Sequence, residues 1–145
     1  MMQGSQARYE ERLVLKSTLE CVSKARESLL SAAQEHGYDS NCCFGLRLAL
    51  EEALSNAIQH GNHNNPGKAV TVHLSVDCGR IKIDITDEGE GFDPSAVPDP
   101  TRSENLLLPA GRGITLMRAF MTDVKFTAKG NQVSMTFVRP VAEGE

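Results

Sequence analysis

The pattern of hydrophobic and polar positions changes its period about halfway along the chain. Before about residue 64, apolar residues recur every three or four positions, the spacing of a helix with one buried face. After residue 69, apolar and polar residues alternate, the spacing of a strand with one buried face. The change predicts helices first and strands afterwards, apart from one short strand at ERLVLKS, residues 11–17.

Two helices are expected in the first half. The first is capped by Ser17 or Thr18 and runs to about residue 36, where Gly37 is a natural stop. The second follows Asp39 or Ser40, runs to about residue 61 and ends in the turn-rich segment NHNNPG. Its apolar residues share one sector and form a core stripe: Leu46, Ala49, Leu50, Ala53, Leu54 and Ala57.

The second half predicts two hairpins. VTVHLSVD and IKIDITD pair around the turn at residues 78–80, and DVKFTAK pairs with QVSMTFV around residues 130–131. Between them lie a long loop, residues 88–112, and a short helix over about residues 113–121. The expected fold class is therefore α+β: a mostly antiparallel sheet with helices on one face and a polar face toward solvent. The inward positions of the last hairpin are Val124, Phe126, Val133, Met135 and Phe137.

Composition and charge narrow the range of partners. The 145 residues fit a single domain, 1–145, and carry 15 Lys+Arg against 19 Asp+Glu, a net charge of -4. No broad basic field is available for nucleic acid or an anionic membrane. No apolar run approaches a membrane span and the first residues lack a signal peptide, so we expect a cytoplasmic protein. The four cysteines and four histidines show no metal-binding spacing, which favours buried free thiols.

Three polar side chains stand close to the core stripe of the second helix. Glu52, Asn56 and His60 are four apart, so they form one row that borders the edge made by Ala49 and Ala53. We expect this row to be half desolvated. A solvated face would more usually pair Glu with Lys or Arg. From the helix alone, a solvated face and a binding site both remain open.

A carboxylate follows the second strand of the first hairpin. Asp87 continues the parity of Ile81, Ile83 and Ile85, which is that of the buried face. A buried carboxylate needs a partner or a ligand. The alternative is that Asp87 turns to solvent at the strand end.

Two glycine pairs flank the long loop. Gly89 and Gly91 would let the backbone approach a flat ligand closely. Gly111 and Gly113 in GRGITLM open a helix whose N–H groups and dipole favour phosphate. Taken alone, the second pair is also compatible with an ordinary helix start.

Taken together, three motifs resemble the ATP-binding fold shared by gyrase, Hsp90, histidine kinases and MutL. E-x-x-x-N-A-x-x-H-G is similar to its N box, D-x-G-x-G to its first glycine box and G-x-G-I-x-L-M to its second. The resemblance covers roughly residues 8–138 and implies a two-layer Bergerat ATP-binding fold with an ATP lid at about 92–112. The short form with N-A-x-x-H-G looks most like the bacterial anti-sigma factor serine/threonine kinases of the RsbW and SpoIIAB type.

The resemblance implies roles for residues of the N box and of the first glycine box. Asn56 would ligate Mg²⁺ that bridges the ATP phosphates, and Glu52 would be the general base. Asp87 would accept a hydrogen bond from the adenine amino group, and Gly89 and Gly91 would leave space for the adenine ring. Glu51, about 100° away from Glu52 on the helix, is expected in solvent.

Further contacts to ATP follow from the same resemblance. Gly111, Arg112 and Gly113 would meet the phosphates, and His60 would be first a structural hydrogen-bonding residue and second a phosphate contact. The chain departs from the family where an arginine precedes the second glycine box, because Pro109 and Ala110 stand there. In the family that arginine can meet the γ-phosphate, so Arg102 or Arg112 must substitute for it, or phosphoryl transfer is impaired.

The implied function is a partner switch. A protein-serine/threonine kinase that uses ATP and Mg²⁺ would phosphorylate a STAS-type anti-sigma factor antagonist and, when free, sequester a sigma factor. The alternative, motivated by the altered arginine, is a nucleotide-binding module with weak or no kinase activity. A detached histidine-kinase catalytic domain is less favoured, because no helix pair with a phosphoacceptor histidine is present. A homodimer is compatible with the resemblance, with Leu48 and Ile58 on the outer side of the second helix.

Overall fold

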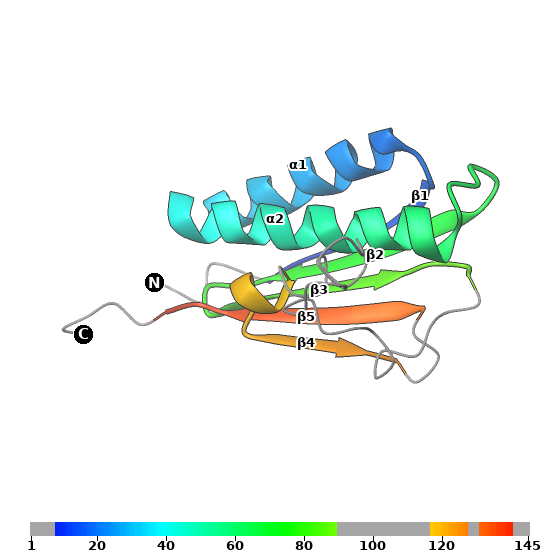
Figure 1. Ribbon diagram of the computed structural model, residues 1–145. Helices are drawn as coiled ribbons and strands as arrows, with labels where there is room; N and C mark the ends of the chain where they lie inside the picture. The colour runs from blue at the N-terminus through cyan, green and yellow to red at the C-terminus, as the bar shows by residue number, and fades with distance from the viewer. Residues whose placement is uncertain (1–7, 90–116, 128–130, 141–145) are drawn as a thin grey trace.

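A computed structural model of the chain describes residues 8–89, 117–127 and 131–140. Its strands pair antiparallel throughout, in the order β1-β2-β3-β5-β4. Figure 1 shows α1 and α2 side by side over one face of this sheet. The predicted α+β class and the single helical layer are confirmed. In chain order the elements are β1 Tyr9–Lys16, α1 Leu19–Glu35, α2 Ser40–Asn56, the π-helical turn η2 Ala57–Gly61, β2 Ala69–Val76, β3 Arg80–Thr86, β4 Asp123–Phe126 and β5 Gln132–Val138.

The helix boundaries follow local signals that the sequence carries. Asp39 caps α2, because its Oδ1 accepts a hydrogen bond from the Cys42 backbone N–H at 2.8 Å. This bond holds the pKa of the Asp39 carboxyl below its ordinary value. Thr18 is the N-cap of α1 without a side-chain bond. Gly37 follows α1 with φ of 85°, a left-handed conformation that glycine adopts without strain.

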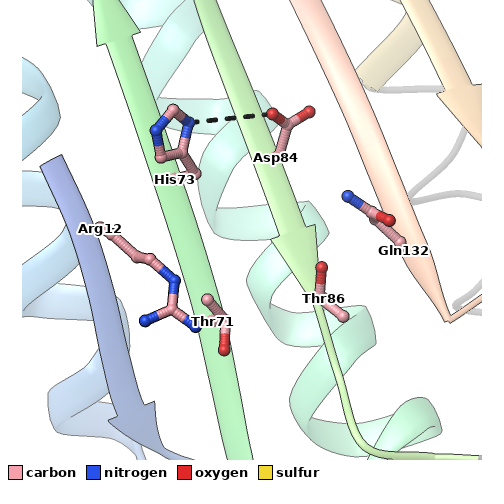
Figure 2. A pocket seen from close by; sticks show the side chains of 6 residues that line it. All are labelled: Arg12, Thr71, His73, Asp84, Thr86 and Gln132. Carbon is pink, nitrogen blue, oxygen red and sulfur yellow. Dashed lines mark ion pairs between the residues drawn. The ribbon is translucent and has the colours of Figure 1, made fainter. Parts of the chain in front are cut away.

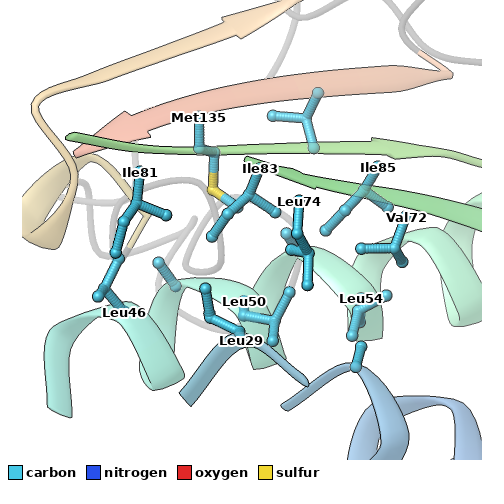
Figure 3. Packing of buried hydrophobic residues seen from close by; sticks show 14 of the residues in the cluster. Leu29, Leu46, Leu50, Leu54, Val72, Leu74, Ile81, Ile83, Ile85 and Met135 are labelled. Carbon is cyan, nitrogen blue, oxygen red and sulfur yellow. The ribbon is translucent and has the colours of Figure 1, made fainter. Parts of the chain in front are cut away.

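The core lies between the helices and the sheet (Figure 3). Alternate residues of β2 and β3 are buried, and so is the predicted stripe of α2, which packs on them. The expected inward residues of β4 and β5 are buried or half-buried, as predicted. The largest fully buried side chains are Leu29, Leu46, Leu50, Leu54, Leu74, Ile81, Ile83, Ile85, Met117, Met135, Val70 and Val72.

One surface assignment was wrong. Ile58 was expected on the outer side of the second helix, but it is 6% exposed and belongs to the core. Ile58 follows Leu54 by four positions, so the two share a row on the helix, and Leu54 is fully buried. Of the two residues named for a dimer contact, Leu48 is half-buried and remains at the surface.

Several elements meet at one end of the sheet. β1 and β3 end there, β2 and β5 begin there, and α2 with η2 ends above them (Figure 1). The register Thr86↔Gln132 between β3 and β5 brings the residue that follows β3 beside the residue that precedes β5. The end of α2 and the segment after β3 carry two of the three motifs, so this end of the sheet is where a site can form.

Candidate functional site

The Asp87 carboxylate lies against Gly61. Asp87 directly follows β3, and Gly61 is the last residue of η2. A Cβ added at Gly61 would overlap the carboxylate atoms of Asp87. The predicted direction of Asp87, toward the helical layer, is therefore confirmed, and the side chain is half-buried.

The backbone on both sides of Asp87 is fixed. The Asp87 N–H donates to the Asn131 carbonyl at 2.9 Å, and the Asn131 side-chain amide donates to the Asp87 carbonyl at 3.3 Å. The Gly89 N–H donates to Asp87 Oδ1 at 2.8 Å. A Cβ at Gly89 would overlap the Gly61 carbonyl. Glycine at 89 lets its backbone pack on the backbone of Gly61, and glycine at 61 leaves room for the Asp87 carboxylate.

The π-turn η2 brings Gly61 to this position. The Asn62 N–H donates to the Ala57 carbonyl at 2.8 Å, five residues back, instead of four as in an α-helix. His63 and Asn64 follow with φ of 52° and 58°, left-handed conformations that are uncommon outside glycine. Single π-turns inside helices occur frequently at functional sites.

Glu52 and Asn56 lie in the last two turns of α2 and are half-buried, as expected. Neither side chain has a hydrogen bond or ion pair with another residue in the described ranges. Their oxygens therefore remain available to a ligand. Carboxylate and amide oxygens are ligand types that Mg²⁺ accepts.

Glu51 differs from Glu52. It was expected in solvent, but its Oε2 accepts from Arg26 Nη1 of α1 at 2.7 Å, and its side chain is 28% exposed. The expectation was wrong because α1 packs beside α2 and supplies the cation, which the sequence of α2 alone does not reveal. Of these two adjacent glutamates, Glu51 is therefore held in an ion pair, whereas Glu52 has no such partner in the part of the chain that the structure describes.

His60 differs from its prediction as well. It was expected in the half-buried row with Glu52 and Asn56 as a hydrogen-bonding residue, but it is exposed and makes no hydrogen bond with the rest of the described chain. The π-turn takes one more residue than an α-helical turn, so His60 rotates out of the row. Its contact with a ligand stays a prediction.

Several predicted site residues lie outside the described residues, so the structure does not test their placement. They are Gly91, Arg102, Gly111, Arg112 and Gly113, together with Pro109, Ala110 and the expected lid at about 92–112.

Sequence reasoning missed Asn62. Its side chain is fully buried and hydrogen-bonded to Ser17, Ala69 and Glu88. The sequence showed only a polar residue in a turn-rich tail. No local sequence pattern indicates these hydrogen bonds, because all three partners belong to other segments.

A separate pocket of about 330 Å³ lies on the other face of the sheet (Figure 2). His73 on β2 reaches toward Asp84 on β3, with 4.0 Å between Nδ1 and Oδ2. None of the predicted site residues lines this pocket. Its lining consists of the outward positions of four strands: Arg12, Thr71, His73, Asp84, Thr86 and Gln132.

Within the described residues, no helix is long and apolar enough to cross a membrane.

Comparison with known proteins agrees with this fold. A family model, the histidine kinase-like ATPase domain, matches residues 15–137. A solved structure of the RsbU and RsbW domains of a Mycobacterium tuberculosis protein matches with a TM-score of 0.62 and 15% identity. The match covers 90% of this chain and 31% of that one, so it supports the fold.

Curated relatives are closer in sequence. Serine-protein kinase RsbW of Bacillus velezensis is 31% identical over 125 residues, 81% of this chain and 78% of the relative. The RsbW kinase of Oceanobacillus iheyensis is 30% identical over 73% of this chain and 71% of its own length. An anti-sigma F factor of Heyndrickxia coagulans is 36% identical over 66% and 65%. The chain belongs to the histidine kinase-like ATPase domain family, in the group that contains the RsbW serine-protein kinases and the anti-sigma F factors.

Proposed function

We propose that this protein is an ATP-dependent protein-serine/threonine kinase that acts as an anti-sigma factor in a partner switch. Its substrate is an anti-sigma factor antagonist, and its second partner is a sigma factor. Relatives named as serine-protein kinases and anti-sigma F factors support this function. One observation carries it: α2 presents Glu52 and Asn56, which make no hydrogen bond or ion pair within the described residues, and the turn that ends the helix lies against the Asp87 carboxylate.

The described residues fit an adenine nucleotide. Asp87 offers carboxylate oxygens that only accept hydrogen bonds, and adenine presents an amino group as a donor. Guanine carries a carbonyl oxygen at the corresponding position, which a carboxylate repels. Gly61 and Gly89 themselves place no side chain against the carboxylate. We therefore assign recognition of the base to Asp87.

Asn56 fits a magnesium ion. Its side-chain carbonyl oxygen is a suitable ligand, and Mg²⁺ in nucleotide sites usually takes only one or two protein ligands besides phosphate oxygens and water. When bound, the ion neutralises charge on the phosphates.

Glu52 is the proposed general base. Its carboxylate takes the proton of the substrate serine hydroxyl while the serine oxygen bonds to the γ-phosphorus of ATP. The bond from that phosphorus to the β-phosphate oxygen breaks, and ADP leaves. Such transfer depends mainly on positioning and charge. Glu51 does not compete, because its ion pair with Arg26 holds it toward α1.

The remaining roles are proposed from the motifs. Gly91 completes the space for the base, while Gly111, Arg112, Gly113 and His60 contact the phosphates. Residues 92–112 form the ATP lid of a single domain, 1–145. Arg102 or Arg112 supplies the cation that the altered position before the second glycine box lacks. We also expect a STAS-type antagonist, a homodimer and a place in the cytoplasm, where sigma factors act.

The direct test is transfer of labelled phosphate from ATP to a purified cognate antagonist. We expect transfer to a serine or threonine hydroxyl that requires Mg²⁺ and stops when EDTA removes the metal. Binding of ATP with Mg²⁺ but without transfer to any cognate antagonist would favour a nucleotide-binding partner switch without kinase activity. Absence of ATP binding would reject both functions.

A further inference from the structure

Asn62 joins three segments at the end of the sheet that carries Asp87. It is the first residue after the π-turn and is 0% exposed. Its Nδ2 donates to Ser17 Oγ at 2.7 Å and to the Ala69 carbonyl at 3.0 Å. Its Oδ1 accepts from the Glu88 N–H at 2.8 Å. The side chain thus connects the end of β1, the start of β2 and the segment after β3.

The chemistry of this junction suits asparagine. A carboxamide supplies two donor hydrogens and an acceptor oxygen in one small planar group. Aspartate would keep the acceptor and lose both donors, and an apolar side chain would lose all three bonds. Ser17 in turn donates to the Lys68 carbonyl at 2.8 Å, so the donor end of Asn62 belongs to a satisfied buried network.

The acceptor oxygen of Asn62, Oδ1, binds a different segment, the one after β3. Glu88 stands between Asp87 and Gly89, so a bond to its N–H fixes the peptide that leaves Asp87. The Glu88 carboxylate also accepts from the Ala69 N–H, on the same strand start that Asn62 holds. Together with the bonds from Asn131, these contacts hold the Asp87 backbone from both sides.

We propose that Asn62 is a positioning residue for base recognition: through the Glu88 N–H it fixes the direction of the Asp87 carboxylate relative to Gly61. The inference rests on the proposed function, in which Asp87 reads the nucleobase. Because Asn62 also caps the π-turn through its own N–H, the turn and the base-reading carboxylate are held by one residue.

The test compares Asn62→Ala with Ser17→Ala. Asn62→Ala removes the acceptor for the Glu88 N–H, while Ser17→Ala breaks the donor side of the network and leaves that acceptor in place. For Asn62→Ala we expect ATP to bind about tenfold more weakly. This loss corresponds to roughly one hydrogen bond to a charged group, here the bond between the base and the Asp87 carboxylate. Binding of Mg²⁺ tripolyphosphate, which has no base, changes less than about twofold, on the same scale. The Glu88 amide exchanges faster in nucleotide-free protein.

Ser17→Ala is expected to lower the melting temperature and to keep the wild-type ratio of ATP to tripolyphosphate affinity. An equal loss of both ligands in Asn62→Ala, or an unchanged exchange rate at Glu88, would show a merely structural role and overturn the inference. If wild type binds ATP and Asp87→Asn weakens it but Asn62→Ala does not, the inference fails and the proposed function stands. If wild type binds no ATP, the proposed function itself fails.

A measurement on the wild-type chain covers the case in which Asn62→Ala does not fold. Adenosine should shift the NMR signals of the Asn62 carboxamide and of the Glu88 amide, whereas tripolyphosphate should leave both in place. Unchanged signals at saturating adenosine would contradict a coupling between Asn62 and the base site.

Discussion

The carboxylate of Asp87 and the backbone of Gly61 are in direct contact, although 26 positions separate them in the sequence. The contact joins the segment after β3 to the end of the π-turn, and it leaves no room for a side chain at position 61. It also places the proposed base-reading group at the end of the helix that carries Glu52 and Asn56. The proposed site therefore depends on how closely these two segments approach.

Gly61→Ala should weaken ATP binding more than it weakens the fold. The three atoms nearest to the new methyl group would be the carboxylate atoms of Asp87, the end of a side chain that can rotate away. Overpacking commonly costs about 1–3 kcal/mol, and we expect the lower end here. ATP affinity should fall at least about tenfold, because the carboxylate leaves its position. Calorimetry and thermal unfolding would measure the two effects.

The matched control is Gly79→Ala in the β2–β3 turn. A Cβ at Gly79 would lie 3.5 Å from Asp77 Oδ1, an ordinary contact. This variant should bind ATP like wild type. Equal ATP affinity in Gly61→Ala and Gly79→Ala would contradict the importance of the contact with Asp87.

Asp87→Asn should reduce the affinity for ATP at least about tenfold and reduce the preference for ATP over GTP. The substitution keeps the size of the side chain but removes its charge and adds a donor, and charge-assisted hydrogen bonds are roughly twice as strong as neutral ones. Titration calorimetry with both nucleotides would measure this. An unchanged affinity would remove the assignment of Asp87 to the base.

Glu52→Gln should slow phosphate transfer by about 10²–10⁴-fold while ATP still binds. Glutamine retains the shape but cannot take the serine proton, and general base catalysis typically contributes about 10²–10⁴-fold. The assay is initial-rate transfer to the antagonist at saturating ATP. Equal rates for the variant and wild type would show that another group acts as the base.

Glu51→Gln serves as the matched control on the same helix. It breaks the ion pair with Arg26, whose side chain is 36% exposed, so the loss of stability should be no more than about 1 kcal/mol. Transfer rates should stay near wild type. A loss of transfer in Glu51→Gln as large as in Glu52→Gln would mean that the two glutamates are not distinct in function.

The thiol of Cys21 should resist alkylation at pH 8. Burial raises its pKa from 9.0 to about 11, so the reactive thiolate is scarce and the side chain is also covered. Cys78 is exposed and should react first. Since the folded-state pKa is raised, this group's contribution to stability is fully present below pH 9 and is lost as the pH rises through about 11. Mass spectrometry of iodoacetamide adducts would give the order, and equal rates would contradict it.

Much of the fold could be predicted because its signals are local. The alternation in β2 and β3, the cap at Asp39 and the stop at Gly37 each depend on residues close in sequence. The parity of Asp87 also predicted its direction correctly, because the alternation of β3 continues in phase one residue beyond the end of the strand.

The remaining features depend on contacts between distant segments. Arg26 reaches Glu51 across 25 positions, and Asn62 reaches Ser17 across 45. The hydrophobic periodicity of a segment does not reveal contacts between residues so far apart in the sequence. The π-turn escaped prediction for another reason: a helix template of 3.6 residues per turn keeps His60 in the row of Glu52 and Asn56, and one extra residue in the turn rotates it away.

The π-turn also has an evolutionary consequence. The length of the segment from Ala57 to Gly61 sets the distance between the helix and the segment after β3, since its last residue packs on Asp87. Loss of one residue would return the turn to α-helical geometry and withdraw Gly61 from Asp87. The exposed Gln59 can vary in kind, whereas an insertion or deletion here would have to be matched by a change in the other segment.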